Sequence, residues 1–264
     1  MMNNVNKTLY IPLYGKSFVS RKGLFIKDIK AEEIWEKEQF PLKGKSKSKW
    51  LAYYMGIRAA VFDDWLREQL KKWEDAVVIH IGCGMDSRVL RVGTEKHTWF
   101  DVDFPEVIEE RKLYFTETSS YRMIAGDVTK GEWMEQLEDC QDKKAIVLME
   151  GVSMYLSCNE TVNLLTALNK HFKEIFLLMD SYTELAAKMS KYRNPINDVG
   201  VTKVYGMDNP KILEFDGFSF VKEHSMTPGK YINELTGLEK MIFEKLYAGK
   251  MAGKLYRMYE FRTM

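Results

Sequence analysis

The sequence predicts an α/β fold: a doubly wound, mostly parallel sheet of seven strands with an N-terminal helical cap. Three observations lead to this prediction. From residue 76 onward short apolar runs alternate with helical patterns, the first run ends in a Gly-x-Gly, and a long amphipathic segment precedes it. Strands that alternate with helices form βαβ units, whose right-handed crossovers produce parallel sheets.

Seven segments have the length and composition of strands. Five apolar runs suit strands buried on both faces of a parallel sheet, and two later segments alternate between apolar and polar residues, as an edge does. The expected strands are 77–81, 98–102, 121–125, 145–149 and 174–179, followed by 217–226 and 254–263.

Helical patterns fill the spaces between these runs. Ser157 and Glu160 form a capping box ahead of apolar residues at helical spacing, which predicts a helix there. A long helix is expected over 50–72, ahead of the sheet, and further helices over 182–192 and 230–247. The loop between those two is marked by Asn194-Pro195, Asp198, Gly200 and Asn209-Pro210.

Length and composition favour one elaborated domain, 1–264. It would comprise a cap (1–75), a cofactor-binding core (76–181), and a lid insertion with closing strands (182–264).

Apolar residues are 45% and charged residues 29% of the chain, which is typical of a globular protein, and the net charge of +1 offers no general attraction to nucleic acid. No apolar run is long enough to span a membrane and no signal peptide is evident, so a soluble, intracellular protein is expected. Three cysteines without Cys-x-x-Cys spacing predict neither disulfides nor a metal site and fit the reducing cytoplasm. The lysine-rich segment 43–49 is interpreted as a solvated, mobile loop rather than a site for an acidic partner.

The Gly-x-Gly after the first strand predicts a nucleoside-containing cofactor. Gly82 and Gly84 allow a sharp turn and close backbone approach, and about 20 residues later Asp101 and Asp103 end the next strand, where a carboxylate can accept hydrogen bonds from ribose hydroxyls. Ser87 stands where the dinucleotide fingerprint has its third glycine, which disfavours a pyrophosphate.

Arg58 falls in the middle of the apolar stripe of the 50–72 helix. A charge turned toward the core is costly unless it meets an opposite charge. Two interpretations have equal support at this point: an internal salt bridge to an Asp or Glu, or a contact with a bound anion.

Four segments together resemble the leucine carboxyl methyltransferase family and, within it, the bacterial branch that includes tetracenomycin-type polyketide O-methyltransferases. They are the N-terminal TLYIPLYG with DIKAEEI, then IHIGCGMDSR (79–88), FDVDFPEVI (100–108) and MEGVSMYL (149–156). The resemblance covers roughly residues 8–182. It implies a class I methyltransferase fold that binds S-adenosylmethionine and delivers its methyl group to an oxygen, often of a carboxylate.

The resemblance assigns roles by position. Arg58 would bind the methionine carboxylate of the cofactor, Glu150 would lie near its amino group, and Gly82 and Gly84 would approach it closely. Asp103 would hold the ribose hydroxyls, with Asp101 as the alternative. Asp127 would contact the adenine amino group, with the Val128 backbone beside it. Taken singly these residues have structural interpretations too: a helix cap for Asp127, a buried pair for Glu150 and a local bridge between Asp86 and Arg88.

A carboxylate acceptor needs no general base, whereas a phenol or alcohol does. Tyr155, five residues after Glu150, is the preferred candidate, with packing on the sheet edge as its structural alternative; His171 and His224 are further candidates, and His80 is interpreted as a buried imidazole. The N-terminal helix and the 187–235 region are expected to act as lids. The leading hypothesis is an O-methyltransferase for a small-molecule carboxylate or hydroxyl. The alternatives are a methyltransferase for protein C-termini, a nicotinamide-dependent oxidoreductase and a non-catalytic cofactor-binding protein.

Overall fold

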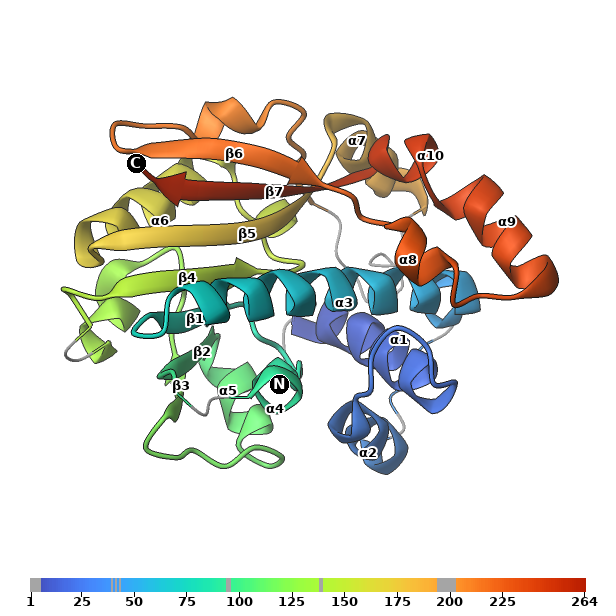
Figure 1. Ribbon diagram of the computed structural model, residues 1–264, viewed down its shortest axis with the longest axis horizontal. Coiled ribbons are helices and arrows are strands. Elements are labelled where there is room, and N and C mark those ends of the chain that lie inside the picture. Colours follow the sequence, from blue (N-terminus) through green and yellow to red (C-terminus); the bar gives the residue numbers. More distant parts are fainter. Residues whose placement is uncertain are drawn as a thin grey trace.

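The computed structural model describes residues 6–38, 40, 42, 44–93, 96–137, 140–193 and 203–264. One twisted sheet of seven strands in the order β3-β2-β1-β4-β5-β7-β6 crosses the molecule (Figure 1). Its strands are β1 (Val77–Ile81), β2 (Trp99–Asp103), β3 (Tyr121–Ala125), β4 (Lys144–Met149), β5 (Glu174–Tyr182), β6 (Phe218–His224) and β7 (Tyr256–Thr263). The first five strands pair in parallel, and β7 inserts antiparallel between β5 and β6. The predicted mostly parallel, seven-stranded fold is confirmed.

Alternate residues of the strands enter two hydrophobic cores, one on each face of the sheet. Val78, Ile146 and Leu178 pack beneath the N-terminal helices, and Val77, Ile79 and Val147 pack against the helix that follows β4. Burial on both faces explains why these strands are continuous apolar runs.

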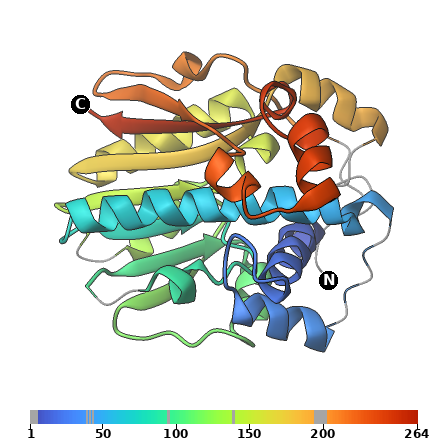
Figure 2. The same ribbon diagram turned by 45° about the vertical axis from the view of Figure 1, so that its right-hand side comes forward.

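The first face carries α1 (Tyr10–Arg21), α2 (Ile29–Glu38), α3 (Lys49–Lys72), α4 (Arg88–Val92), α5 (Pro105–Arg111), α8 (Gly229–Ile232) and α9 (Gly237–Tyr247); the other carries α6 (Cys158–His171). The remaining helices are α7 (Glu184–Arg193), α10 (Lys250–Gly253) and the 3-10 turns η1 (Asn6–Leu9), η2 (Gly44–Lys47), η3 (Gly131–Gln136), η4 (Ser153–Tyr155) and η6 (Pro210–Leu213). Figure 2 shows α1, α2, α7, α9 and α10 at the same end of the sheet. The expected helical cap is therefore present, and C-terminal helices join it.

The capping box is confirmed: the Ser157 and Glu160 side chains bind each other's backbone N–H groups at the start of α6. The helix expected over 230–247 is wrong as a single element: α8 ends at Ile232, Thr236 has an extended backbone, and α9 begins at Gly237, whose φ is 53°. The lysine-rich segment is not a wholly solvated loop. In its described part η2 buries Ser46, and Ser48 caps α3 by accepting a hydrogen bond from Trp50 N. Of the expected loop signals, Asn194 to Gly200 lie outside the described residues, whereas Asn209 caps η6.

Candidate functional site

A cavity of about 960 Å³ lies at the carboxyl ends of β1 to β4. The loops after these strands form its floor, and η1, α1, α3, α7, α9, α10 and the start of β7 contribute its walls. In a parallel sheet this edge is where polar strand-end groups converge on a ligand. Among the described residues no cluster of His, Cys, Asp and Glu side chains is arranged for a metal ion.

The turn after β1 requires glycine for two separate reasons. Gly82 and Gly84 have φ values of 65° and 50°, which side chains disfavour. A Cβ atom at Gly82 would also lie 2.2 Å from Cγ2 of Val152 in the loop after β4. Both glycines line the cavity. The turn is therefore compact, and it leaves room beside it for a ligand.

Asp103, the last residue of β2, closes this turn. Its carboxylate accepts hydrogen bonds from Gly84 N at 2.7 Å and Phe104 N at 2.8 Å, and it lines the cavity. Burial raises the pKa of Asp103 to about 6. The expected alternative, Asp101, is wrong on position: its buried carboxylate is outside the cavity lining and binds Arg111, Tyr121 OH and Trp99 Nε1.

Asp127 and Val128 follow β3 and line the cavity beside Asp103, as expected. Asp127 Oδ1 accepts hydrogen bonds from the Thr129 backbone N at 3.0 Å and from its hydroxyl at 2.7 Å. The side chain therefore stabilises a tight local turn and is not a helix cap.

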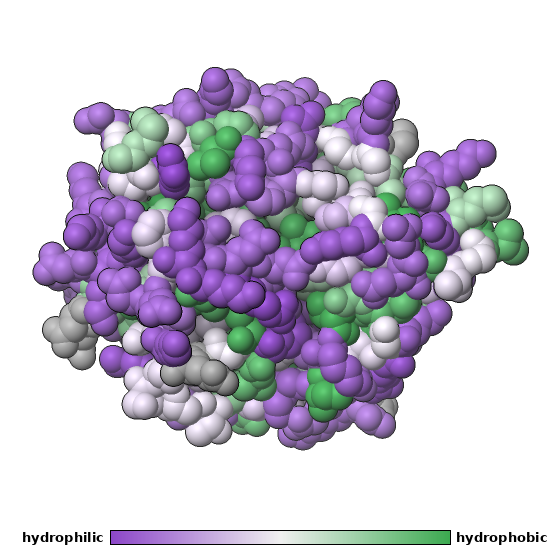
Figure 3. Space-filling model, in the orientation of Figure 1, coloured by the Kyte–Doolittle hydropathy of each residue, from purple (hydrophilic) through white to green (hydrophobic). Residues whose placement is uncertain are grey.

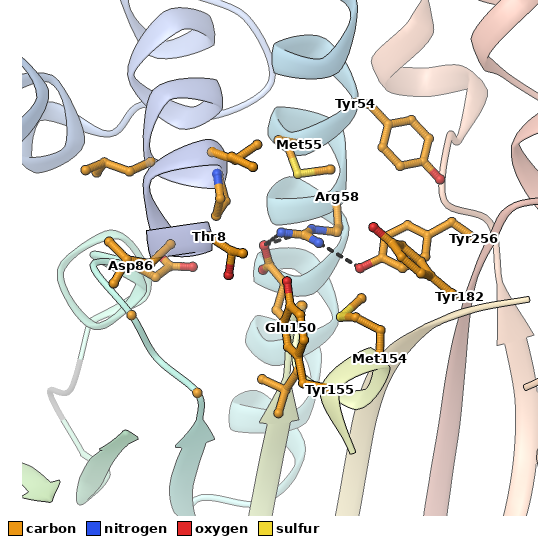
Figure 4. A pocket seen from close by; sticks show the side chains of 18 of the residues that line it. Thr8, Tyr54, Met55, Arg58, Asp86, Glu150, Met154, Tyr155, Tyr182 and Tyr256 are labelled. Atoms are coloured by element: carbon orange, nitrogen blue, oxygen red, sulfur yellow. Dashed lines mark hydrogen bonds and ion pairs between the residues drawn. The ribbon is translucent and has the colours of Figure 1, made fainter. Parts of the chain in front are cut away.

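Arg58 projects from α3 to the centre of the cavity wall (Figure 4). Its Nε and Nη2 atoms each lie 3.0 Å from Glu150 Oε1, and Nη1 donates to Asp180 Oδ2 at 3.1 Å and to Tyr256 OH at 2.9 Å. The internal salt bridge considered from the sequence is thus present, and the guanidinium also faces the cavity. The two interpretations of Arg58 are compatible.

Glu150 is held between two arginines. Burial alone would raise its pKa, but attraction to Arg88 and Arg58 lowers the pKa of Glu150 to about 2, so it is an anion. Asp180, which ends the apolar part of β5 and lies behind Arg58, has its pKa raised to about 6 by burial, against the attraction of Arg58.

A buried ion-pair network extends from Glu150 to the cap. Arg88 binds Glu150, Asp86 and Asp63, and Lys16 of α1 lies 2.9 Å from Asp86. The bridge between Asp86 and Arg88 is therefore confirmed as part of a larger network. Sequence reasoning missed Lys16, Asp180 and Tyr256. Asp180 could have been found from its position near a strand end, whereas Lys16 and Tyr256 come close only through packing.

Labelled lining side chains lie on both sides of Arg58 in Figure 4, and we group the lining residues into two halves accordingly. We call the first the polar half; it contains Gly82, Gly84, Asp86, Asp103 and Asp127. The second, the aromatic half, contains Trp50, Leu51, Tyr54, Tyr182, Leu246, Tyr247 and Tyr256. In Figure 4, Tyr54, Tyr182 and Tyr256 gather on one side of Arg58, and Thr8 and Asp86 lie on the other.

The candidate bases differ in position. Tyr155 lines the cavity, as its position after Glu150 predicts, and it also packs against the core. Burial raises the pKa of Tyr155, which keeps the phenol neutral. His171 and His224 lie outside the cavity lining. His80 lines its floor, is buried, and lies between Asp101 and Arg88. Of the expected lids, η1 and α1 line the cavity, and so do Met189 and Ser190 of α7 in the described part of 187–235. Residues of α9 and α10, further along the chain, line it as well.

The sequence profile of the leucine carboxyl methyltransferase family matches residues 4–169 of the 264. The chain belongs to this family. The tetracenomycin polyketide synthesis O-methyltransferase TcmP of Streptomyces glaucescens is 27% identical over 91% of this chain and 90% of its own length. The S-adenosyl-L-methionine-dependent methyltransferase dpfgK of Gibberella zeae is 28% identical over 64% of this chain and 61% of its own. This member of the family is a methyltransferase that uses S-adenosylmethionine.

Solved methyltransferases share the fold. An S-adenosylmethionine-dependent methyltransferase from Anabaena variabilis superposes with a TM-score of 0.55 at 11% identity. Magnesium protoporphyrin IX methyltransferase from Synechocystis, solved with S-adenosylhomocysteine, gives 0.52 at 12%. Each comparison covers 89% of this chain and 93% of the other. The predicted class I methyltransferase fold is confirmed, and the nicotinamide alternative has no support.

Proposed function

We propose that this protein transfers the methyl group of S-adenosylmethionine to a carboxylate oxygen of a small apolar acid. The observation that carries the proposal is the division of one cavity into a polar and an aromatic half, with Arg58 and Glu150 between them. Such a division suits a polar nucleoside donor on one side and an apolar acceptor on the other.

The polar half fits the donor. S-adenosylmethionine presents a diol, an adenine edge, an ammonium and a carboxylate, which call for carboxylate acceptors and one cationic donor. We assign Asp103 to the ribose hydroxyls, Asp127 and the Val128 backbone to the adenine edge, and Gly82 and Gly84 to close backbone approach. Glu150 would attract the ammonium, and Arg58 would bind the carboxylate through charge-assisted hydrogen bonds.

The aromatic half fits an acceptor that needs no base. None of the seven residues grouped into this half is a carboxylate or a histidine. Burial raises the pKa of Tyr54 and Tyr256, so both phenols stay protonated at neutral pH. A carboxylic acid is already ionised there. Its oxygen gains the methyl carbon as the carbon–sulfur bond breaks, the bonding pair stays with sulfur, and no proton moves. The chain's task is to align the two reactants.

Enclosure favours a small acceptor over a protein terminus, because η1, α1, α7, α9 and α10 surround the cavity. The face in Figure 3 is largely hydrophilic, with hydrophobic side chains at the end where α9 lies. There Leu238, Met241 and Leu246 are exposed, and Leu246 also lines the cavity, which suits entry of an apolar molecule. No helix in the described part of the chain is long and apolar enough to cross a membrane. We propose that the protein acts in the cytoplasm and has no nucleic-acid partner.

Two measurements test the proposal. Calorimetry with S-adenosylmethionine, S-adenosylhomocysteine and NAD should show binding of the first two only. A screen of apolar carboxylic acids and matched phenols, read by formation of S-adenosylhomocysteine, should show turnover of acids. Turnover of phenols without acids would refute the carboxylate assignment, and binding of NAD alone would refute the donor.

A further inference from the structure

Tyr54 has a buried hydroxyl that no described group satisfies. Its oxygen is shielded from solvent and has no hydrogen-bond partner, although its side chain lines the cavity. Buried polar atoms are nearly always paired with protein, water or ligand, and the position of this hydroxyl beside the cavity makes it available to a bound molecule.

The other cavity tyrosines differ. The Tyr256 hydroxyl donates to Asp180 Oδ2 at 2.8 Å and accepts from Arg58 at 2.9 Å, and the Tyr155 hydroxyl has a hydrogen bond with Thr8. Among the described tyrosines that line the cavity, only Tyr54 has a buried hydroxyl without a partner. Its hydrogen is therefore free to bind an acceptor.

Tyr54 is also placed correctly relative to the donor site. It precedes Arg58 by four residues on α3, so the two side chains share one helix face about 6 Å apart along the axis. In Figure 4 its ring lies on the aromatic side of Arg58, beside Tyr256, with ring centroids 6.2 Å apart. One face of one helix thus presents a cation to the polar half and a neutral hydrogen-bond donor to the aromatic half.

We propose that Tyr54 binds the methyl acceptor: its hydroxyl donates a hydrogen bond to one carboxylate oxygen of an apolar acid in the aromatic half, which turns the other oxygen toward the donor. This inference rests on the proposed function. A neutral phenol orients the carboxylate without neutralising it as a cation would. Because the carboxylate loses its charge as the ester forms, the hydrogen bond is stronger before the reaction, and Tyr54 contributes to KM more than to kcat.

The test is titration of 2-naphthoate into protein saturated with S-adenosylhomocysteine, with wild type and Tyr54→Phe compared. We expect binding of 2-naphthoate to weaken about 10-fold in the variant, as loss of a hydrogen bond to a charged group predicts, with unchanged affinity for S-adenosylhomocysteine. With an acid found in the screen, KM should rise about 10-fold and kcat should change less than about twofold. Tyr259→Phe is the matched control, because Tyr259 lies in the other core, outside the cavity lining, and also has a buried hydroxyl.

Equal 2-naphthoate affinity in folded wild type and Tyr54→Phe would overturn the assignment of Tyr54 and leave the proposed function intact. The same holds if wild type loaded with S-adenosylhomocysteine does not bind 2-naphthoate. Weaker binding in both Tyr54→Phe and Tyr259→Phe would also overturn it, because the effect would then be structural. Failure of wild type to bind S-adenosylhomocysteine would refute the proposed function itself.

Discussion

Replacing Arg58 tests whether its buried charge serves only the fold or also holds the donor. Arg58→Ala removes the hydrogen bonds to Glu150, Asp180 and Tyr256 together with the proposed contact to the methionine carboxylate. A charge-assisted hydrogen bond contributes about 1.5–3 kcal/mol, so affinity for S-adenosylhomocysteine should fall about 10- to 100-fold. Removing one partner of a buried ion pair should also lower the free energy of unfolding by about 3–5 kcal/mol.

A second variant separates these two effects. Arg58→Lys keeps the charge but loses the planar fork that contacts Glu150 through two nitrogens. Arg91→Lys is the matched control. Arg91 is a buried arginine paired with Asp28, Asp63 and Asp86 but lies outside the cavity lining. Both lysine variants should be less stable than wild type, and only Arg58→Lys should bind the nucleoside more weakly.

Calorimetry with S-adenosylhomocysteine and thermal unfolding with and without it provide the assay. At a ligand concentration of about 100 times the wild-type Kd, binding stabilises the protein by about 2.7 kcal/mol, and a tenfold loss of affinity halves this. For a chain of this size the ligand-induced rise in Tm should shrink by about 3 °C. Wild-type affinity in folded Arg58→Ala and Arg58→Lys would refute the reasoning and leave Arg58 with a purely structural role.

Three further predictions concern the polar half. Asp127→Ala should weaken binding of S-adenosylhomocysteine about 10- to 100-fold in calorimetry. Thr129→Val removes only the hydroxyl bound to Asp127 and should leave this affinity unchanged. Equal losses in the two variants would mean that Asp127 acts by stabilising the turn and not by contacting the ligand. The pKa of Asp103 is about 6 in the folded protein, compared with 3.8 for an ordinary aspartate. Between these values the folded state binds more protons than the unfolded state. The free energy of unfolding of the ligand-free protein should therefore fall as the pH rises from about 4 to above 6. Between pH 4.5 and 7.5 this fall amounts to about 2 kcal/mol, and Asp103→Asn should remove it in urea titrations at these two pH values; an unchanged pH dependence would contradict the shift. Gly82→Ala should lower the free energy of unfolding, measured in urea, by about 1–3 kcal/mol. Adding Val152→Ala should recover part of that loss, because it removes the Cγ2 atom that would lie 2.2 Å from the new Cβ. If nothing is recovered, the whole cost comes from the φ of 65° at residue 82.

The sequence by itself determined the sheet and the strand-end residues. Periodicity is a local property, so the apolar runs and the capping box of α6 specified their elements directly. Because parallel strands end at one edge, the positions of Gly82, Asp103, Asp127 and Glu150 along the chain were enough to assign them to one site. The break just before Gly237 was missed because one glycine within a helical pattern is often tolerated.

The tertiary structure decided which of those side chains line the cavity and which residues form its aromatic half. Asp101 and Asp103 lie on one face of the same strand, yet Arg111 packs against the first and leaves only the second in the cavity. Arg58 contacts Asp180 and Tyr256, residues 122 and 198 positions away. The aromatic half gathers side chains from α3, β5, α9 and β7, and the unpaired hydroxyl of Tyr54 exists only because this packing buries it. Contacts between elements far apart in the sequence depend on how the helices pack against the sheet, and no local sequence pattern encodes that packing.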